Sequence, residues 1–205
     1  MDKIRLGMVG GGEGAFIGEV HRISARMDER FILCAGALCS DPDRSLRSAL
    51  DLGITRDRSY TDYTEMAKSE SKRDDGINFV SIVTPNHLHH PVAKIFLESG
   101  INVICDKPMT MNSEEAKELI DISERSNLIF AVTYNYSGYP LIREAREIVK
   151  EGKLGEIRII QVEYIQDWLT EPIEKSGHKQ ASWRVDPSKS GLGGSIGDIG
   201  THAFH

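Results

Sequence analysis

Asp198 and His202 form the pair of side chains whose types and spacing best suit acid–base chemistry. They lie four residues apart in the run Gly-Asp-Ile-Gly-Thr-His, which begins at Gly197. In a helix this spacing places both side chains on one face. There the carboxylate can orient the imidazole ring and stabilise its charged form. The sequence therefore predicts a carboxylate–imidazole pair in this part of the chain.

Two further groups of polar residues follow apolar runs that we expect to be strands. The first is Thr84-Pro85-Asn86 with His89, after residues 77–83, and the second is Asp106-Lys107-Pro108, after residues 101–105. In an open α/β sheet, ligands bind outside the carboxyl ends of the strands. We therefore expect both groups to lie beside a bound nicotinamide ring.

A glycine-rich stretch near the N-terminus predicts the site for the rest of such a cofactor. The run from Gly10 to Gly18 directly follows an apolar segment and precedes a helical pattern. Glycines at a strand-to-helix turn let backbone N–H groups approach a phosphate, and the helix dipole favours its charge. The small-residue positions are Gly10, Gly12 and either Ala15 or Gly18, so two registers fit a dinucleotide-binding loop. The alternative is an ordinary glycine-rich turn.

The next expected strand, residues 31–39, ends in Ser40-Asp41. An acidic residue there is placed to meet the ribose hydroxyls of a dinucleotide. Asp41 favours NAD because its carboxylate would repel a 2′-phosphate, whereas Ser40 and Arg44 could accommodate NADP. The same Ser40-Asp41-Pro42 sequence also reads as a helix start, with a capping side chain followed by proline.

Strand and helix patterns alternate through the first two thirds of the chain. Strands are expected at residues 4–9, 31–39, 77–83, 101–105 and 128–133, and helices at residues 18–27, 42–52, 62–72, 87–99 and 113–125. This alternation predicts right-handed βαβ crossovers and a Rossmann-type, doubly wound parallel sheet. The polar residues 69–76 are expected to be a solvated loop or a frayed helix end.

The pattern changes after about residue 136. Residues 140–150 are amphipathic and helical, residues 156–168 alternate like one long strand, and residues 170–194 are polar. We expect a dinucleotide-binding domain over residues 1–136 and the beginning of an incomplete α+β domain over residues 137–205. A long strand without a visible partner favours a homo-oligomer, since an unpaired edge invites pairing.

Composition excludes several classes of partner. The net charge of −6 and the absence of a basic run argue against a nucleic acid or an anionic membrane as partner. The three cysteines lie in apolar segments without metal-like spacing, so we expect buried thiols and no metal site. No apolar stretch is long enough to span a membrane, and the sequence predicts a cytoplasmic protein.

Taken together, these motifs resemble the Gfo/Idh/MocA family, the group of glucose–fructose oxidoreductase and inositol dehydrogenase. The resemblance rests on the glycine loop with His21, the T-P-N-x-x-H run ending at His89, the D-K-P triplet with Lys107, and the run ending at His202. Asp106 stands where the family has glutamate, and the glycine loop is longer than usual.

The family resemblance implies a nicotinamide dinucleotide cofactor and a sugar or polyol substrate. By position, Lys107 would hydrogen-bond the reacting oxygen, Asp198 would bind and orient, and His202 would be the general base. Each residue also has an ordinary structural interpretation: Lys107 as a solvated lysine, Asp198 as a helix N-cap, and His202 as a structural histidine. Trp183 and Arg184 are candidates for the substrate pocket, with core packing as the alternative.

The motifs leave three functions open. The first is an NAD(P)-dependent dehydrogenase acting on CH–OH groups. The second is a nucleotide-binding sensor or regulatory protein without turnover. The third is an enzyme that uses transient oxidation by NAD to cleave a glycosidic bond.

Overall fold

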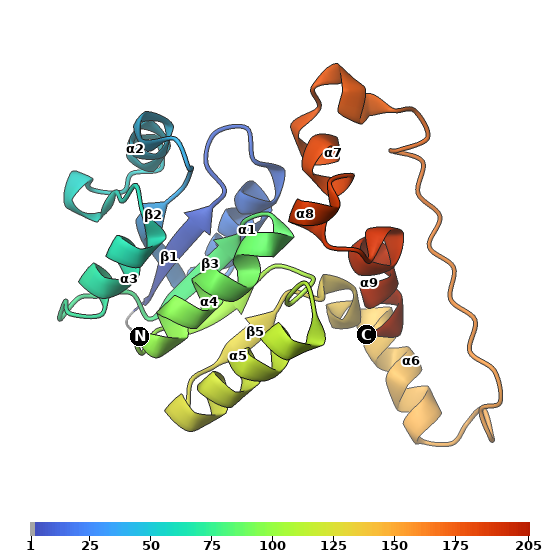
Figure 1. Cartoon of the computed structure of the whole chain (residues 1–205). Coiled ribbons are helices and arrows are strands. Elements are labelled where there is room, and N and C mark those ends of the chain that lie inside the picture. The colour runs from blue at the N-terminus through green and yellow to red at the C-terminus, as the bar shows by residue number, and fades with distance from the viewer. Residues whose placement is uncertain (1–2) are drawn as a thin grey trace. The chain divides into compact units, whose positions relative to one another are not determined.

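The chain folds into two compact units, the first ending at Val132 and the second beginning at Thr133. The structure is a computed structural model that describes residues 3–205 (Figure 1). Residues 1 and 2, with which the predicted first domain begins, lie outside the described residues. The predicted domain limits, 1–136 and 137–205, remain a prediction.

A five-stranded sheet organises unit 1. Its strands are β1 (Ile4–Gly10), β2 (Phe31–Ala37), β3 (Phe79–Val83), β4 (Asn102–Cys105) and β5 (Phe130–Val132). All neighbouring strands pair in parallel, in the order β2-β1-β3-β4-β5. The predicted Rossmann-type sheet is therefore confirmed. The chain moves outward from β1 to β2 and then resumes on the other side of β1 at β3, so the strand order reverses between β1 and β3. In such sheets this reversal opens a ligand crevice at the carboxyl ends of the strands.

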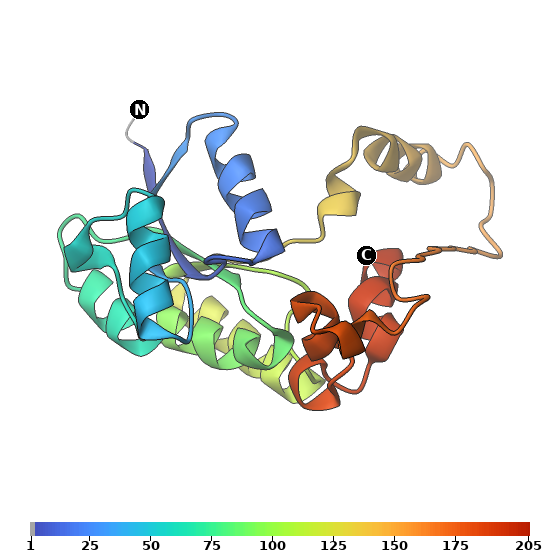
Figure 2. The ribbon, with the colours of Figure 1, turned by 90° about the horizontal axis from the view of Figure 1, so that it is seen from above.

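Helices cover both faces of the sheet. They are α1 (Phe16–Arg26), α2 (Pro42–Asp51), α3 (Tyr63–Glu70), α4 (His89–Glu98) and α5 (Ser113–Ser126). Helix α1 lies on one face and helices α3, α4 and α5 lie on the other (Figure 2). Three helices begin where the sequence offers a cap: the side chains of Asp41, Asp62 and Asn112 accept backbone N–H groups at the starts of α2, α3 and α5.

The core of unit 1 lies between the sheet and these helices. Val80 and Ile82 of β3 and Val103 of β4 are completely buried, as is Phe96 of α4. Residues 79–83 of the β-branched run predicted at 77–83 therefore form a strand buried on both faces, as the composition predicts. Removing this apolar surface from water is the main stabilising contribution to the unit.

One polar residue in unit 1 contradicts the sequence prediction. Glu70 falls in the polar stretch expected to be a solvated loop, yet only 1% of it is exposed. Its carboxylate accepts hydrogen bonds from the Arg58 guanidinium, from the Tyr60 hydroxyl at 3.0 Å and from the Ile77 backbone N–H at 3.2 Å. A buried carboxylate needs such partners, and these come from segments that precede and follow it in the chain. Burial, with the nearby Glu70 carboxylate, raises the pKa of Tyr60 to about 12.

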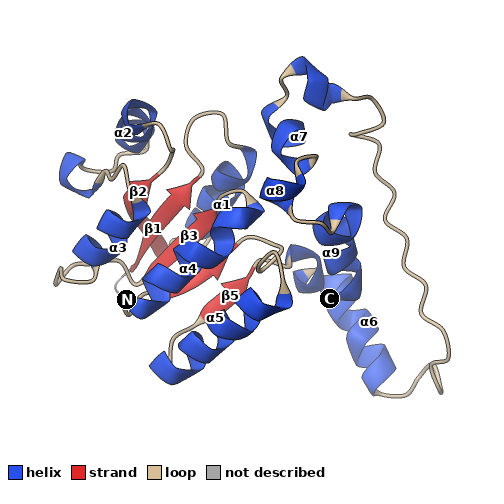
Figure 3. Ribbon diagram, in the orientation of Figure 1, coloured by secondary structure: helices blue, strands red, loops and turns tan. Residues whose placement is uncertain are grey.

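Unit 2 is built from short helices joined by a long extended segment (Figure 3). The helices are α6 (Pro140–Lys150), α7 (Lys179–Arg184), α8 (Pro187–Ser190) and α9 (Thr201–Phe204), with a π-helical turn at Ile196–Gly200. Short 3-10 turns lie at Asn135–Gly138 and Ile173–Ser176 in this unit, and at Arg56–Arg58 and Asn86–Leu88 in unit 1.

The strand predicted for residues 156–168 is wrong. Within the described part of unit 2 no strand forms, and residues 156–166 run as extended chain. Ile159 and Ile165, two of the alternating apolar residues, are 87% and 91% exposed. A strand needs a neighbour to accept its ladder hydrogen bonds, and the described residues of this unit supply none.

Candidate active site

The glycine loop leaves β1 in a conformation that only glycine adopts without strain. Gly10 and Gly11 have φ angles of +81° and +76°. A Cβ on Gly10 would lie 2.9 Å from the Val83 carbonyl oxygen, and one on Gly18 would lie 2.4 Å from the Gly11 Cα. Gly18 is therefore the position at which helix α1 meets the loop, whereas Ala15 is the N-cap of that helix. This close approach favours Gly18 over Ala15 as the third small residue of the loop.

Contacts from distant parts of unit 1 hold this loop in place. Arg22 Nη1 donates to the Gly11 carbonyl oxygen at 2.7 Å, and Gly12 N donates to the Leu38 carbonyl oxygen at 3.1 Å. Glu13 N donates to Ser48 Oγ at 3.1 Å. Sequence reasoning missed Arg22 and Ser48, because neither belongs to a recognisable motif. These contacts fix the position of the loop backbone relative to β1, β2 and α2.

Asp41 follows β2, as the sequence predicts, and its side chain bonds to the first turn of the helix that comes next. Its Oδ1 accepts the Arg44 backbone N–H at 2.7 Å and so caps helix α2. Ser40, Asp41 and Arg44 are all at the surface or partly exposed. The capping interpretation of Ser40-Asp41-Pro42 is therefore confirmed. The contact of Asp41 with a ribose remains a prediction.

The end of β3 supplies a polar atom without a partner inside the protein. Thr84 Oγ1 is buried and has no hydrogen-bond partner within residues 3–205. The same side chain lies beside the glycine loop, because a Cβ on Gly10 would lie 3.1 Å from Thr84 Cγ2. A buried hydroxyl without a partner costs about 1–3 kcal/mol. A buried hydroxyl without a protein partner, on a side chain beside the glycine loop, fits a bound dinucleotide.

Asn86 and His89 lie inside the protein just beyond Thr84. Asn86 is 8% exposed and His89 is 1% exposed. His89 Nδ1 lies 2.6 Å from the Pro108 carbonyl oxygen, and His89 Nε2 lies 3.0 Å from the Thr84 carbonyl oxygen. Burial lowers the pKa of His89, while the two carbonyls and the Asp106 charge oppose this shift. Because both ring nitrogens face protein carbonyls, the geometry favours a positioning role for His89 over direct contact with a cofactor.

Asp106, in the predicted D-K-P motif, lies beside a second, partly buried histidine. Its carboxylate is 4.0 Å from His21 Nε2, and His21 Nδ1 is 2.8 Å from Ser81 Oγ. Burial lowers the pKa of His21, and the Asp106 carboxylate partly counteracts this. The Asp106 backbone N–H donates to the Ile82 carbonyl oxygen at 2.9 Å, which ties the end of β4 to β3. Lys107 follows directly, at the carboxyl edge of the sheet.

Asp198 and His202 lie in unit 2, on the π-helical turn and on α9 respectively. Asp198 lies inside the turn, whose N-cap is Ser195, so the N-cap interpretation of Asp198 is not what the structure has. Its Oδ1 lies 3.6 Å from Arg184 Nε. The His202 ring packs against Tyr136, with the ring centroids 4.5 Å apart. Residues 196–204 are helical, as the prediction requires, and the pairing of Asp198 with His202 remains a prediction.

Arg184 and Trp183 pack together beside Asp198. The Arg184 guanidinium lies 4.5 Å from the centroid of the Trp183 ring and 5.4 Å from that of Trp168. Arg184 Nη1 also donates to Gln180 Oε1 at 2.9 Å. Gln180 was missed by sequence reasoning. Held in this way, Arg184 places a positive charge next to the Asp198 carboxylate, and its role toward a substrate remains a prediction.

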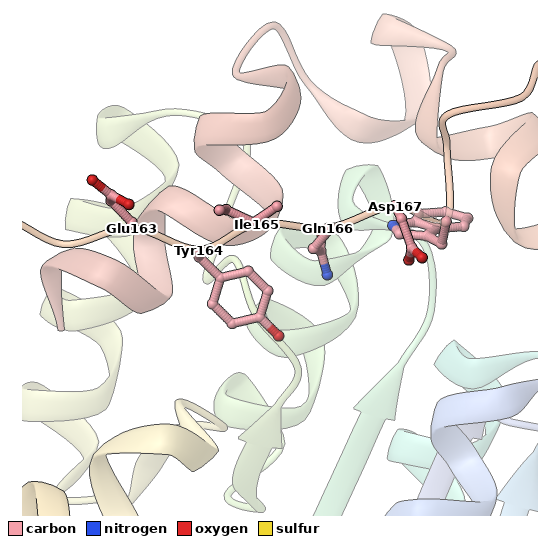
Figure 4. A pocket seen from close by; sticks show the side chains of 6 residues that line it. Glu163, Tyr164, Ile165, Gln166 and Asp167 are labelled. Carbon is pink, nitrogen blue, oxygen red and sulfur yellow. The ribbon is translucent and has the colours of Figure 1, made fainter.

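A shallow surface hollow in unit 2 is lined by Glu163, Tyr164, Ile165, Gln166, Asp167 and Trp168 (Figure 4). These six side chains come from one extended segment and include none of the predicted catalytic or cofactor-binding residues. Ligand sites are usually concave and are formed by polar groups that converge from several elements. We therefore do not place the active site in this hollow.

Neither a metal cluster nor a membrane-spanning helix occurs in the described part of the chain. Among residues 3–205, no three His, Cys, Asp or Glu side chains are grouped so as to hold a metal ion. None of the helices described there is long and apolar enough to cross a membrane.

Comparison with known proteins identifies the family. Residues 4–134 match the family described as an oxidoreductase family with an NAD-binding Rossmann fold, and residues 142–205 match the GFO/IDH/MocA C-terminal domain. The chain belongs to the Gfo/Idh/MocA oxidoreductase family. The resemblance drawn from the four sequence motifs is thereby confirmed.

Several members of the Gfo/Idh/MocA family resemble this chain along its whole length. An uncharacterized oxidoreductase of Bacillus subtilis is 38% identical over 98% of the chain and 52% of its own length. The levoglucosan dehydrogenase of Pseudarthrobacter phenanthrenivorans is 31% identical over 100% of the chain and 50% of its own length.

A solved structure from Azotobacter vinelandii resembles this chain in its three-dimensional fold. It is an inositol dehydrogenase homolog complexed with NAD⁺, 40% identical, with a TM-score of 0.94 over 99% of this chain and 52% of that one. An inositol dehydrogenase homolog from the same organism has also been solved with NADH and myo-inositol. The chain therefore spans about half the length of the Gfo/Idh/MocA proteins that it matches.

Proposed function

We propose that this chain carries the cofactor site and catalytic residues of an NAD-dependent dehydrogenase that acts on a hydroxyl carbon of a sugar or polyol. The observation that carries the proposal is the buried Thr84 hydroxyl, which has no hydrogen-bond partner within residues 3–205, on a side chain beside the glycine loop. It lies where the strand order of the sheet reverses. A nicotinamide dinucleotide bound there supplies the hydride acceptor or donor.

The residues of unit 1 bind the cofactor and stabilise charge. The backbone of the glycine loop at the start of α1 binds the diphosphate, because a glycine-rich strand-to-helix turn lets an anion approach the backbone N–H groups. The Lys107 ammonium hydrogen-bonds the substrate oxygen and favours the alkoxide that develops as the hydride leaves the carbon. The backbone hydrogen bond from Asp106 to β3 fixes the position of the chain immediately before Lys107.

The residues of unit 2 handle the proton. His202 takes the hydroxyl proton, since an imidazole has an ordinary pKa near neutrality. Asp198 orients the substrate and the ring, and the Arg184 guanidinium lies beside the Asp198 carboxylate. Trp183 packs against Arg184 and so supports this arrangement.

We further propose NAD as the cofactor, with NADP as the alternative. Asp41 supports NAD because a carboxylate at the end of β2 repels a 2′-phosphate. Structures of the inositol dehydrogenase homolog and of levoglucosan dehydrogenase hold NAD⁺ or NADH, whereas a D-xylose dehydrogenase relative from Haloarcula marismortui is named for NADP⁺. The names of these relatives also support the sugar or polyol class of substrate. A homo-oligomer and a cytoplasmic location complete the proposal.

The test begins with fluorescence titration of the purified chain by NADH and by NADPH at one salt concentration, followed by a screen of polyols and sugars for NADH formation. We expect Lys107→Ala to abolish turnover while the NADH dissociation constant changes by less than about threefold. Lys68→Ala, at an exposed lysine of α3, is the matched control and should retain full activity. Full activity of Lys107→Ala would remove this lysine from the mechanism. Release of sugar without net NADH would indicate glycosidic cleavage instead.

A further inference from the structure

His89 connects the two loops that carry the predicted reaction chemistry of unit 1. It is the first residue of α4 and is 1% exposed, so its ring is enclosed by protein. One ring nitrogen lies 3.0 Å from the carbonyl oxygen of Thr84, at the end of β3. The other lies 2.6 Å from the carbonyl oxygen of Pro108, in the loop after β4. A single imidazole thus spans neighbouring strand ends.

Both loops depend on this ring for a fixed position. Thr84 carries the buried hydroxyl without a hydrogen-bond partner in residues 3–205, and its methyl carbon lies beside the glycine loop. Lys107 lies between Asp106, whose N–H is bonded to β3, and Pro108, whose carbonyl faces His89. The backbone on either side of Lys107 is therefore attached to β3 or its following turn. The contact on the Pro108 side comes from a side chain, so a substitution can remove it.

We propose that His89 is a positioning residue for hydride transfer, whose ring packs against the Thr84 carbonyl, donates a hydrogen bond from Nδ1 to the Pro108 carbonyl oxygen, and thereby places the Lys107 ammonium. This inference rests on the function proposed above. His89 does not touch substrate or cofactor in this assignment, because its ring is buried and both nitrogens face the protein. Its effect reaches the reaction through Lys107.

The neighbouring residue His90 offers a matched control. His90 Nε2 lies 2.7 Å from Glu118 Oε2 on helix α5, so its contact is between two helices and not between the site loops. His89→Asn, His89→Gln and His90→Asn would each be made in the whole chain. Circular dichroism and NADH titration would show that each variant is folded.

The first measurement follows Lys107 directly. Acetic anhydride labels lysine amines, and mass spectrometry gives the labelling rate of Lys107 relative to the exposed Lys68 in the same sample. We expect the labelling rate of Lys107 relative to that of Lys68 to change by about threefold or more in the His89 variants, or the pH at which labelling of Lys107 is half-maximal to shift. The reason is that the Pro108 side of the loop is released. The His90 variant should match the parent. A folded His89 variant with unchanged Lys107 labelling would overturn the inference.

The second measurement is turnover of the polyol found in the screen. We expect kcat to fall about 10–100-fold in the His89 variants with the NADH dissociation constant within about threefold of the parent, because a displaced catalytic group costs rate more than cofactor affinity. An unchanged kcat would count against His89 as a positioning residue. A parent that turns over no substrate would refute the proposed function, and the labelling result would still decide the placement of Lys107.

A third measurement needs no substitution. Nitrogen-15 NMR of labelled histidine in the parent protein reports which ring nitrogens carry protons. We expect His89 Nδ1 to be protonated between pH 6 and 8, because it must donate to the Pro108 carbonyl. An unprotonated Nδ1 would mean that His89 does not donate to the Pro108 carbonyl and would overturn the inference. This result holds even if both His89 variants fail to fold.

Discussion

Unit 1 and unit 2 contain similar apolar side chains but bury them to different extents. In unit 1 the alternating and continuous apolar runs pair as strands and are covered by helices, so Phe96, Val80 and Ile82 are completely buried. In unit 2, Ile159 and Ile165 follow an equally regular alternation and are almost fully exposed. The difference teaches that an apolar pattern produces a core only where a hydrogen-bonding neighbour allows the segment to become a strand.

The largest effect should come from truncating a core phenylalanine. Phe96 is 0% exposed in unit 1 and Phe204 is 89% exposed in unit 2. We expect Phe96→Ala to lower the free energy of unfolding by about 3–5 kcal/mol, because it leaves a cavity, and Phe204→Ala to change it by less than about 0.5 kcal/mol. Urea unfolding followed by circular dichroism measures both. Equal losses would erase the contrast between the units.

The buried ion pair of unit 1 should be nearly as sensitive. Glu70→Gln keeps the size of the side chain but removes the buried negative charge bonded to the Arg58 guanidinium, which is 7% exposed and is left with its 3.6 Å ion pair to Asp75. We expect a loss of about 3–5 kcal/mol in the free energy of unfolding. Asp186→Asn, which breaks the exposed pair with Lys189 in unit 2, should cost less than about 1 kcal/mol. A Glu70 variant as stable as the parent would show that the pair contributes nothing to unit 1.

The glycine loop allows a sharper comparison within unit 1. Gly11 and Gly14 have φ angles of +76° and +74°, but a Cβ on Gly11 would lie 2.9 Å from Met8 Sδ, whereas one on Gly14 would meet nothing within 4 Å. Both alanine substitutions impose the same backbone strain, and only Gly11→Ala also displaces the packed loop. We expect the NADH dissociation constant to rise about tenfold or more for Gly11→Ala, a change of about 1.4 kcal/mol, and clearly less for Gly14→Ala. Equal effects on both would assign the loss to strain alone.

The smallest effect should be the dependence of stability on pH. Burial lowers the pKa of His21 and of His89 below the ordinary value of 6.5. Between the lowered values and 6.5 the unfolded chain binds more protons, so stability rises with pH in this window and is lost as the pH falls below about 6.5. The slope is at most about 1.4 kcal/mol per pH unit for each histidine. Urea midpoints at pH 7, 6 and 5.5 test this. The parent should lose stability across the series, and His21→Gln should reduce the slope.

Much of unit 1 could be predicted because its signals are local. The five strands and their helices follow from apolar runs bounded by glycine, proline and capping residues, and the structure confirms the sheet. Helix α1 begins at Phe16, two residues before the predicted start, because its N-cap Ala15 has no capping side chain to announce it. The burial of Glu70 depends on Arg58, twelve residues away, and no local pattern encodes such a contact.

The candidate site likewise has parts that the sequence predicted and parts that it did not. Motifs predicted which residues lie at the strand ends, including Thr84, Asp106 and Lys107. They did not predict that Arg22 and Ser48 fasten the glycine loop, nor that both nitrogens of His89 face backbone carbonyls. These contacts are made between segments brought together by the sheet, so they become visible only after folding.

The extended segment at residues 156–166 has a consequence for how the protein is handled. A protease binds its substrate as an exposed, extended strand, and this stretch already has that form, with Arg158 within it. Compact sheet and helix backbone must first open before it can be cut. Brief exposure to trypsin should therefore cleave here before it cuts the sheet, and storage with protease inhibitors would preserve the covalent link between the cofactor loop and His202.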